Sequence, residues 1–371
     1  VGGAAVLSLS VLLTNDLVGG SALMAALPQS LRIVSTITII FFPPACVLGT
    51  IQPTIARWAI EQSTRTGSAF GNVGAWGTAG NILGTFLTGF VLLSAFGVKS
   101  IVLSSVAVLG VTAAGLLALS LLWPAPESSQ ENRPKAPIKS KVDPRQDEGW
   151  ARIMPNVFVF ASGLSIMMVE LVGSRLLSHA SGTSIYSWTS LIGVVLAGIS
   201  IGNFLGGKIA DRFDPSRTLP HLFLIASILC ALLLMGDTLL KSPSVGSEFV
   251  HWAFRVKPDD LSRSSSESST IVSWLMPTSI FASVFILFLA PTCALGTISP
   301  VAAKLALERA EKAGQAIGNV YAWGAIGSIV GSFLTGFLLI SLMGTKAVIC
   351  AVAGVLALVS VCMVSSGLGH A

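Results

Sequence analysis

The chain contains a series of apolar runs, each long enough to cross a lipid bilayer. A membrane-spanning helix needs about 20 consecutive apolar residues. Because a backbone in lipid must satisfy its own hydrogen bonds, such runs predict an all-α polytopic membrane protein. About ten spans are expected, at 1–20, 31–52, 71–93, 99–123, 152–172, 184–206, 218–240, 270–292, 317–340 and 346–366.

The composition leaves little room for a soluble domain. Of 371 residues, 53% are hydrophobic and 11% are charged, whereas soluble domains average about 25% charged residues. One long polar stretch, rich in proline, serine and charge, is typical of a linker. We therefore predict a first membrane half at 1–123 with four spans, a linker at 124–150 and a second membrane half at 151–371 with six spans.

The positions of Lys and Arg predict the orientation. If the linker is cytoplasmic, alternation of the spans places about 14 of the 22 basic residues on the cytoplasmic side. We expect an integral protein of the bacterial inner (plasma) membrane, with the linker and C-terminus cytoplasmic. This topology explains the net charge of +5, and no nucleic-acid partner is expected. The five cysteines and four histidines show no ligand spacing, so neither a metal site nor a cofactor is predicted.

One block of the sequence occurs twice. Residues 49–99 align with 296–346 without a gap, and 27 of the 51 positions are identical. Both copies cross the membrane in the same direction, so the repeat is parallel and relates two homologous halves. Tracing the repeat backwards leaves the first half two spans short. The chain is therefore either N-terminally truncated by about 70 residues or an intrinsically uneven bundle of four plus six spans.

Several repeated residues are not demanded by helix packing alone. Asn72 and Trp76 recur as Asn319 and Trp323. An amide inside a bilayer needs a hydrogen-bond partner. These four residues either have a structural role or line a solute pathway, and we treat them as candidate substrate-binding residues.

A second group of candidates surrounds an acid in the second half. Glu170 lies near the outer end of its predicted span, and Tyr186 and Trp188 begin the next one. A carboxylate with nearby aromatic rings could bind an amine by charge and cation–π attraction. Alternatively, Glu170 is solvated or paired with Arg175.

Two motifs resemble known families. The pattern G-x-x-x-G-G-x-I-A-D-R at 202–212 resembles the loop between the second and third spans of major facilitator transporters. ELVGSRLL at 170–177, followed by GTSIYSWT at 182–189, resembles the membrane portion of fused spermidine synthase-like proteins. The resemblance implies a major-facilitator-like bundle of two parallel-repeat halves. It also implies that Lys208, Asp211 and Arg212 bias one conformation through contacts at helix ends, the alternative being a solvated turn with topogenic charge.

The resemblance also implies a function. The expected activity is that of the membrane module of a spermidine synthase-like protein, which moves or presents a small cationic solute such as a polyamine. The chain contains no Gly-rich nucleotide pocket of an aminopropyltransferase, so no catalytic residue is assigned. Such an enzyme would be a fused or separate partner. The alternatives are a non-transporting anchor for that enzyme and an interaction subunit of a membrane complex.

Overall fold

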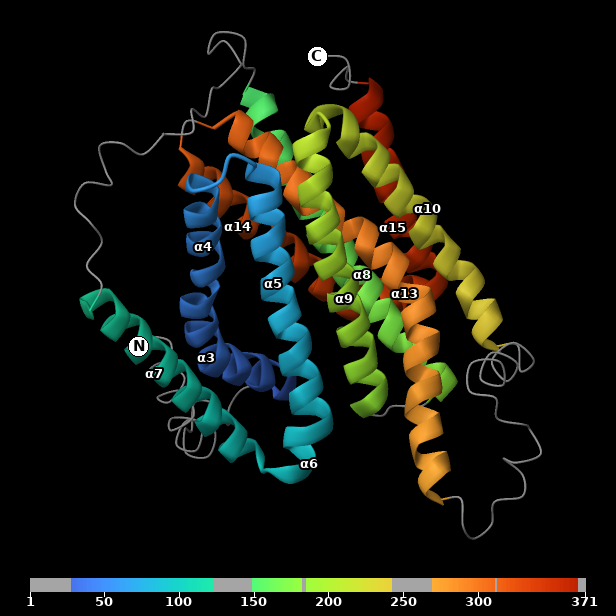
Figure 1. The fold of residues 1–371 in the computed structure, drawn as a ribbon. Coiled ribbons are helices and arrows are strands. Elements are labelled where there is room, and N and C mark those ends of the chain that lie inside the picture. Colours follow the sequence, from blue (N-terminus) through green and yellow to red (C-terminus); the bar gives the residue numbers. More distant parts are fainter. Residues whose placement is uncertain (1–27, 123–148, 182–184, 242–268, 311, 366–371) are drawn as a thin grey trace. The chain divides into compact units, whose positions relative to one another are not determined.

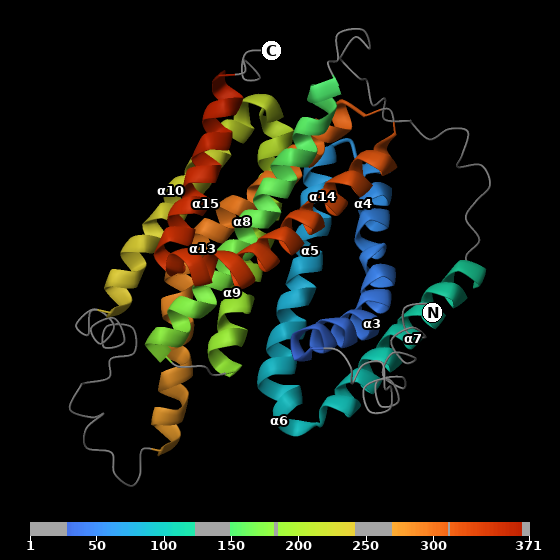
Figure 2. The same ribbon diagram turned by 180° about the vertical axis from the view of Figure 1, so that it is seen from behind.

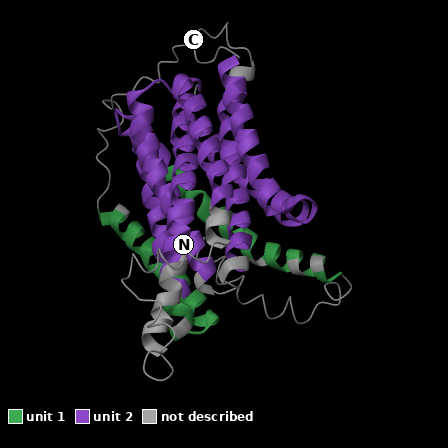
Figure 3. Ribbon diagram, turned by 90° about the vertical axis from the view of Figure 1, so that its right-hand side faces the viewer, with its two compact units in different colours: residues 1–55, 90–137 green, residues 56–89, 138–371 purple. Residues whose placement is uncertain are grey.

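The computed structural model describes residues 28–122, 149–181, 185–241, 269–310 and 312–365, and all regular structure in these ranges is helical (Figure 1). The chain divides into two compact units. The first comprises residues 1–55 and 90–137, and the second comprises residues 56–89 and 138–371 (Figure 3).

The described part of the first unit contains α3 (Gln29–Gly49), α6 (Leu93–Ala95) and α7 (Val98–Leu122). A single residue, Thr50, separates α3 from α4 (Ile51–Glu61), and α4 continues into the second unit. The segment between the predicted spans 31–52 and 71–93 is therefore mostly helical, and only residues 62–65 connect α4 to the next helix.

The described part of the second unit contains seven long helices: α5 (Thr66–Phe86), α8 (Gly149–Ser181), α9 (Ile185–Arg212), α10 (Pro215–Lys241), α13 (Ser269–Glu308), α14 (Ala313–Phe333) and α15 (Ile340–Ser365). Helix α9 packs against both α5 and α13. Helix α14 packs against α8, and α10 packs against α13 and α15 (Figure 2). The core lies among these helices, where Phe158 of α8 meets Phe223 of α10 edge to face at 5.8 Å.

Within the described residues, seven helical segments are long and apolar enough to cross a membrane. One of them, 313–365, covers both predicted spans at 317–340 and 346–366, and Gly344 interrupts it with a φ of 75° that favours glycine. The predicted span 71–93 is helical but is not among the seven, and the predicted span 1–20 lies outside the described residues. The protein is an all-α polytopic membrane protein, as predicted.

The two copies of the repeat form the same succession of elements. Helix α5 continues into a π-helical turn, η1 (Leu87–Leu92), and α14 continues into η3 (Leu334–Leu339). These turns occupy equivalent positions, and both begin with Leu-Thr-Gly-Phe. Because π-helices are rare, their recurrence at matched residues indicates that the local sequence encodes them.

Glycines allow α9 to approach its neighbours closely. A Cβ atom on Gly207 would lie 2.7 Å from the carbonyl oxygen of Gly67 in α5, and one on Gly206 would lie 2.6 Å from that of Thr297 in α13. Ser200 also donates a hydrogen bond to the carbonyl of Ala75 at 2.9 Å. Small residues and interhelical hydrogen bonds hold helices together in lipid, where burying apolar surface gives little gain.

The two copies of the repeat use different glycines for packing. In α14, a Cβ on Gly331 would lie 2.6 Å from the carbonyl oxygen of Leu164 in α8. The equivalent residue in α5, Gly84, would meet nothing within 4 Å. Helix α5 instead uses Gly71, where a Cβ would overlap the carbonyl of Asn203 in α9. Equivalent helices therefore pack on different partners through different parts of one sequence.

These contacts predict unequal effects of adding one methyl group to α5. Gly71→Ala should lower the free energy of unfolding by about 1–3 kcal/mol, because the backbones of α5 and α9 must separate. Thermal unfolding in a mild detergent, followed by circular dichroism, measures the effect. Gly84→Ala is the matched control and should be neutral or slightly stabilising, since alanine favours helix. Equal losses in the two variants would contradict the packing.

Candidate functional site

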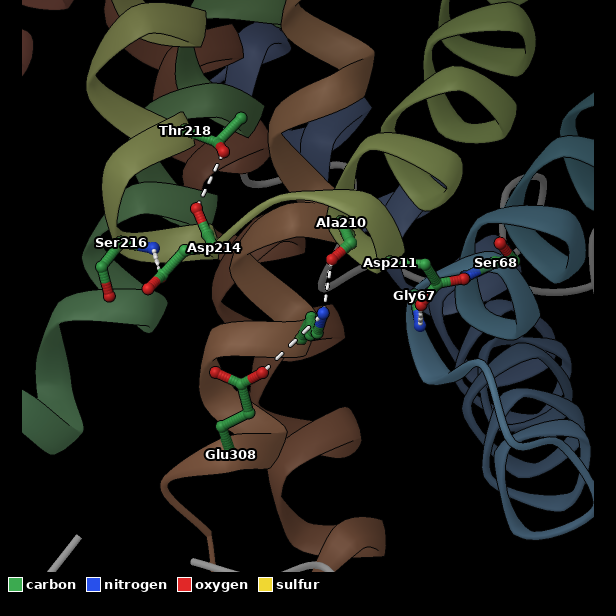
Figure 4. Close-up of polar contacts among 9 residues, drawn as sticks. Gly67, Ser68, Ala210, Asp211, Asp214, Ser216, Thr218 and Glu308 are labelled. Carbon is green, nitrogen blue, oxygen red and sulfur yellow. Dashed lines mark hydrogen bonds and ion pairs between the residues drawn. The ribbon is translucent and has the colours of Figure 1, made fainter. Parts of the chain in front are cut away.

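The end of α9 is bound to the start of α5 through a carboxylate. Asp211 accepts a hydrogen bond from the backbone N–H of Gly67 at Oδ1 (2.9 Å) and from that of Ser68 at Oδ2 (2.8 Å). Figure 4 shows both oxygens directed at the first turn of α5. We call this pair of bonds the Asp211 cap. It joins residues 144 and 143 positions apart in the sequence.

The first turn of α5 needs this cap because its own N-cap residue does not supply one. That residue is Arg65, and its side chain makes no capping hydrogen bond. The first N–H groups of a helix have no partner within the helix, and together they form the positive end of its dipole. An anionic group from α9 therefore satisfies two backbone donors and interacts favourably with the dipole.

The residue at position 67 must be small for the cap to form. A Cβ atom there would lie 2.8 Å from both Oδ1 of Asp211 and the Cβ of Ala210. Gly67 therefore permits the carboxylate to reach the backbone. The same close approach of α5 and α9 brings Gly207 against Ser68, where a Cβ on Gly207 would lie 3.1 Å from the Ser68 Cα.

Three residues later, a second aspartate caps the following helix. Asp214 accepts a hydrogen bond from the N–H of Ser216 at 2.9 Å, and its carbonyl accepts one from the hydroxyl of Thr218 at 2.8 Å (Figure 4). Pro215 occupies the first position of α10, where a missing N–H costs nothing. Asp211 thus caps α5, which is distant in the sequence, and Asp214 caps α10, which follows it directly.

A lysine on α13 completes the arrangement. Lys304 donates a hydrogen bond from Nζ to the carbonyl of Ala210, in the last turn of α9, and lies 3.9 Å from Glu308. The last carbonyls of a helix lack intrahelical donors and form the negative end of the dipole. A cation therefore stabilises the end of α9 at the point where Asp211 leaves it.

The other predicted conformational residues lie beside the cap without joining it. Both Lys208 and Arg212 are exposed. The Nζ of Lys208 lies 3.9 Å from the ring centroid of Phe204, and the guanidinium of Arg212 lies 5.7 Å from that of Phe213. Of the three residues, Asp211 alone contacts the start of α5 through a hydrogen bond in the described part of the chain.

The start of α14, the repeat equivalent of α5, has a different environment. Its N-cap residue is Lys312, which also makes no side-chain cap. A Cβ on Gly314 would lie 3.2 Å from Cδ of Arg57, whose Nε forms an ion pair with Glu61 at 2.7 Å. Gly314, the repeat equivalent of Gly67, therefore lies next to a cationic side chain, whereas Gly67 lies next to a carboxylate.

Glu170 lies further inside its helix than the sequence suggested. Helix α8 continues to Ser181, so Glu170 precedes its end by eleven residues, or about 16 Å. It is half-buried, and it lies seven residues after Gly163, on the face that packs against α14. No ion pair joins it to Arg175 among the described residues. Glu170 is also the only acidic residue in the span Ile153–Ser178.

The aromatic residues proposed to accompany Glu170 begin α9. Trp188 is 47% exposed and lies in the first turn of that helix. Tyr186 belongs to the same turn, and its side chain lies outside the described part of the structure. Trp188 thus lies within about 5 Å of the start of α9, whereas Glu170 lies about 16 Å before the end of α8. No described contact brings Glu170 and Trp188 together.

The four repeated candidates do not share one environment. Trp323 contacts Phe160 of α8 edge to face at 6.3 Å, whereas Trp76 is 80% exposed. Asn72 and Asn319 are both exposed, and Asn319 lines a pocket of about 170 Å³ at the start of α14. Equivalent sequence positions therefore do not give equivalent sites.

Sequence reasoning missed Lys304 and Asp214 as members of the site. An aspartate directly before a helix that begins with proline is a recognisable capping signal, so Asp214 could have been found. Lys304 lies 94 positions from the carbonyl that it binds, and no local pattern marks such a contact. Within the described part of the chain, no group of three His, Cys, Asp or Glu side chains is placed to hold a metal ion.

The geometry defines a helical membrane protein in which a duplicated helix is capped by a carboxylate of another helix. Comparison with known proteins specifies the family. Residues 4–253 match the Major Facilitator Superfamily, and residues 177–368 match the MFS_1 like family. The chain belongs to the Major Facilitator Superfamily and forms a transporter-like membrane module. No curated protein and no solved structure matches the chain.

The cap predicts a measurable change when its charge is removed. In Asp211→Asn, one oxygen remains and the charge is lost, so the start of α5 should be bound more weakly by about 1 kcal/mol. Spin labels at Ser63 and His221, both near this end of the second unit, would report the distance between the α4–α5 connection and α10 by double electron–electron resonance. We expect a broader and longer distribution in the variant.

The control is Asp214→Ala, which removes the side-chain cap of α10 and leaves that of α5 intact. It should lower stability without lengthening the Ser63–His221 distance. A distance distribution in Asp211→Asn that coincides with the wild type would show that the cap does not hold the two helices together.

Proposed function

We infer that the chain transports a small organic cation by alternating access, and that the Asp211 cap stabilises the state in which its end of the bundle is closed. The observation that carries this inference is the cap itself. It joins two helix ends through two backbone donors and one carboxylate, and hydrogen bonds of this kind can break and reform. A parallel repeat also suits rocking of two halves about a central path.

Glu170 is the proposed contact for the solute. An ionisable group within a membrane span is expensive and usually serves a function. Its depth in α8 and its position on the face toward α14 support a location beside a pathway. Trp188 and Tyr186 are proposed to contact the cation closer to the membrane surface, as are the repeated Asn and Trp residues.

The chemistry of the solute is proposed from the sequence. A polyamine combines several cationic amines with apolar segments, so it suits a single acid and aromatic rings. The resemblance to spermidine synthase-like proteins favours the same solute and suggests a fused or separate aminopropyltransferase as a partner. The division into halves at 1–123 and 151–371 remains a prediction.

The structure supports the proposed orientation. One pocket is lined by Arg65 of the α4–α5 connection, Lys208 and Arg212 of α9, and Lys304 of α13. An excess of Lys and Arg is typical of the cytoplasmic side. The end with the Asp211 cap is therefore proposed to face the cytoplasm, in a bacterial inner membrane, on the same side as the linker.

Uptake by proteoliposomes tests the solute site. Glu170→Gln should reduce uptake of radiolabelled spermidine by roughly ten-fold or more, because the neutral amide cannot balance the charge of the amine. Elution in size-exclusion chromatography and thermal stability should stay near those of the wild type. Glu61→Gln is the matched control, since it neutralises an exposed acid at a helix end and should leave uptake unchanged.

The outcomes separate the candidate functions. Full uptake by Glu170→Gln would contradict the role of Glu170 while leaving transport intact. Absence of spermidine uptake by the wild type would contradict polyamine transport. It would favour a non-transporting anchor for an aminopropyltransferase or an interaction subunit, and co-purification in mild detergent would then test for the partner.

A further inference from the structure

A pocket of about 580 Å³ lies beside the Asp211 cap, and its charge is unbalanced. Its lining includes four cationic side chains from the α4–α5 connection, α9 and α13: Arg65, Lys208, Arg212 and Lys304. Asp211 is the one acid of the lining. The volume lies within the range of small-ligand sites, about 300–1,000 Å³.

The acid in this pocket is already engaged. Both oxygens of the Asp211 carboxylate accept hydrogen bonds from the first turn of α5. No ion pair joins Arg65, Lys208 or Arg212 to an acid in the described ranges. Lys304 lies 3.9 Å from Glu308. Among the described residues, three cations therefore line the pocket without an ion-pair partner, and their mutual repulsion falls when an anion binds.

The remaining lining suits an anion that accepts several hydrogen bonds. Thr64, Thr66 and Ser68 carry hydroxyl groups and surround the positive end of α5. Arginine binds phosphate through two parallel hydrogen bonds, and lysine binds it as a point charge. Basic pockets between membrane helices are suited to the phosphate groups of anionic lipids.

We propose that this pocket binds a phosphate group, carried either by an anionic lipid headgroup or by a soluble phosphate. The bound group bridges Arg65 of the α4–α5 connection, Lys208 and Arg212 of α9, and Lys304 of α13. It thereby stabilises the arrangement in which Asp211 caps α5. This site is distinct from the proposed solute site at Glu170, and it binds an anion where that site binds a cation.

Two measurements on the full chain in a neutral detergent test the proposal and separate the two sources. Native mass spectrometry gives the affinity for phosphatidylglycerol, with phosphatidylcholine as the zwitterionic reference. Thermal unfolding in the presence of inorganic phosphate gives the affinity for the free anion. Both signals should weaken as ionic strength rises, because exposed charges are screened by salt.

The test variant is Arg65→Gln with Lys208→Gln, which removes two cations and leaves the Asp211 cap and Lys304 in place. It should bind the phosphate group roughly ten-fold more weakly or worse. The single variant Arg65→Gln should lose less affinity for the phosphate group. It should also fold as the wild type does, because the Arg65 side chain makes no capping hydrogen bond. Arg217→Gln removes one cation outside the pocket, as Arg65→Gln removes one inside it, and should bind the phosphate group as the wild type does.

Each outcome decides the proposal. A difference between the double variant and the wild type with phosphatidylglycerol alone assigns a lipid headgroup, and one with inorganic phosphate alone assigns a soluble anion. Identical binding by the two proteins in both measurements overturns the site. Glu170→Gln should bind the phosphate group normally, so failure of this proposal is distinguishable from failure of the proposed transport.

Discussion

The close approach of α5 and α9 is the constraint on which the rest of the site depends. In lipid, helices are held by van der Waals contact and interhelical hydrogen bonds, and both require small residues at the interface. Gly71 and Gly207 let the two backbones come near enough for the end of α9 to reach the first turn of α5. The Asp211 cap and the neighbouring phosphate pocket follow from that approach. A substitution that separates the helices would remove both, even if every charged side chain remained.

Duplication gave the chain two copies of one helix, and the copies have acquired different partners. Both keep the π-helical turn at Leu-Thr-Gly-Phe, which is a local property of the sequence. They differ where α5 has Gly74 and α14 has Tyr321. A Cβ on Gly74 would lie 3.0 Å from Nδ2 of Asn203, whereas the Tyr321 ring packs against Phe70 at 5.4 Å. At this position, Gly74 of the first copy lets α9 approach α5 closely, whereas the Tyr321 side chain of the second copy fills the space between α14 and α5.

The sequence predicted the helical membrane fold and the motif that ends α9, because apolar length and a Gly-rich charged turn are local signals. It did not predict the partner of Asp211, since that partner is backbone N–H, which every residue except proline carries. The position of Glu170 within α8 was also missed, because apolar length cannot show that α8 extends beyond residue 172 to Ser181. The segments PPACVLGTIQP (43–53) and PTCALGTISP (291–300) are alike, yet the helix breaks at Thr50 in the first, whereas α13 continues without interruption through the second. Packing, which the sequence does not display, determines such outcomes.

The chemical nature of the Asp211 cap suits a reversible contact. A carboxylate that binds a helix N-terminus contributes about 1 kcal/mol, up to about 2 in partly buried geometries. Since about 1.4 kcal/mol changes an equilibrium ten-fold, such a contact can favour one conformation without trapping the protein in it. A buried ion pair would resist opening more strongly, because breaking it leaves a charge without a partner in a low-dielectric environment. The cap instead releases its carboxylate at an open pocket lined by cations, where the freed charge keeps favourable neighbours. The cations of this pocket therefore lower the cost of opening this end.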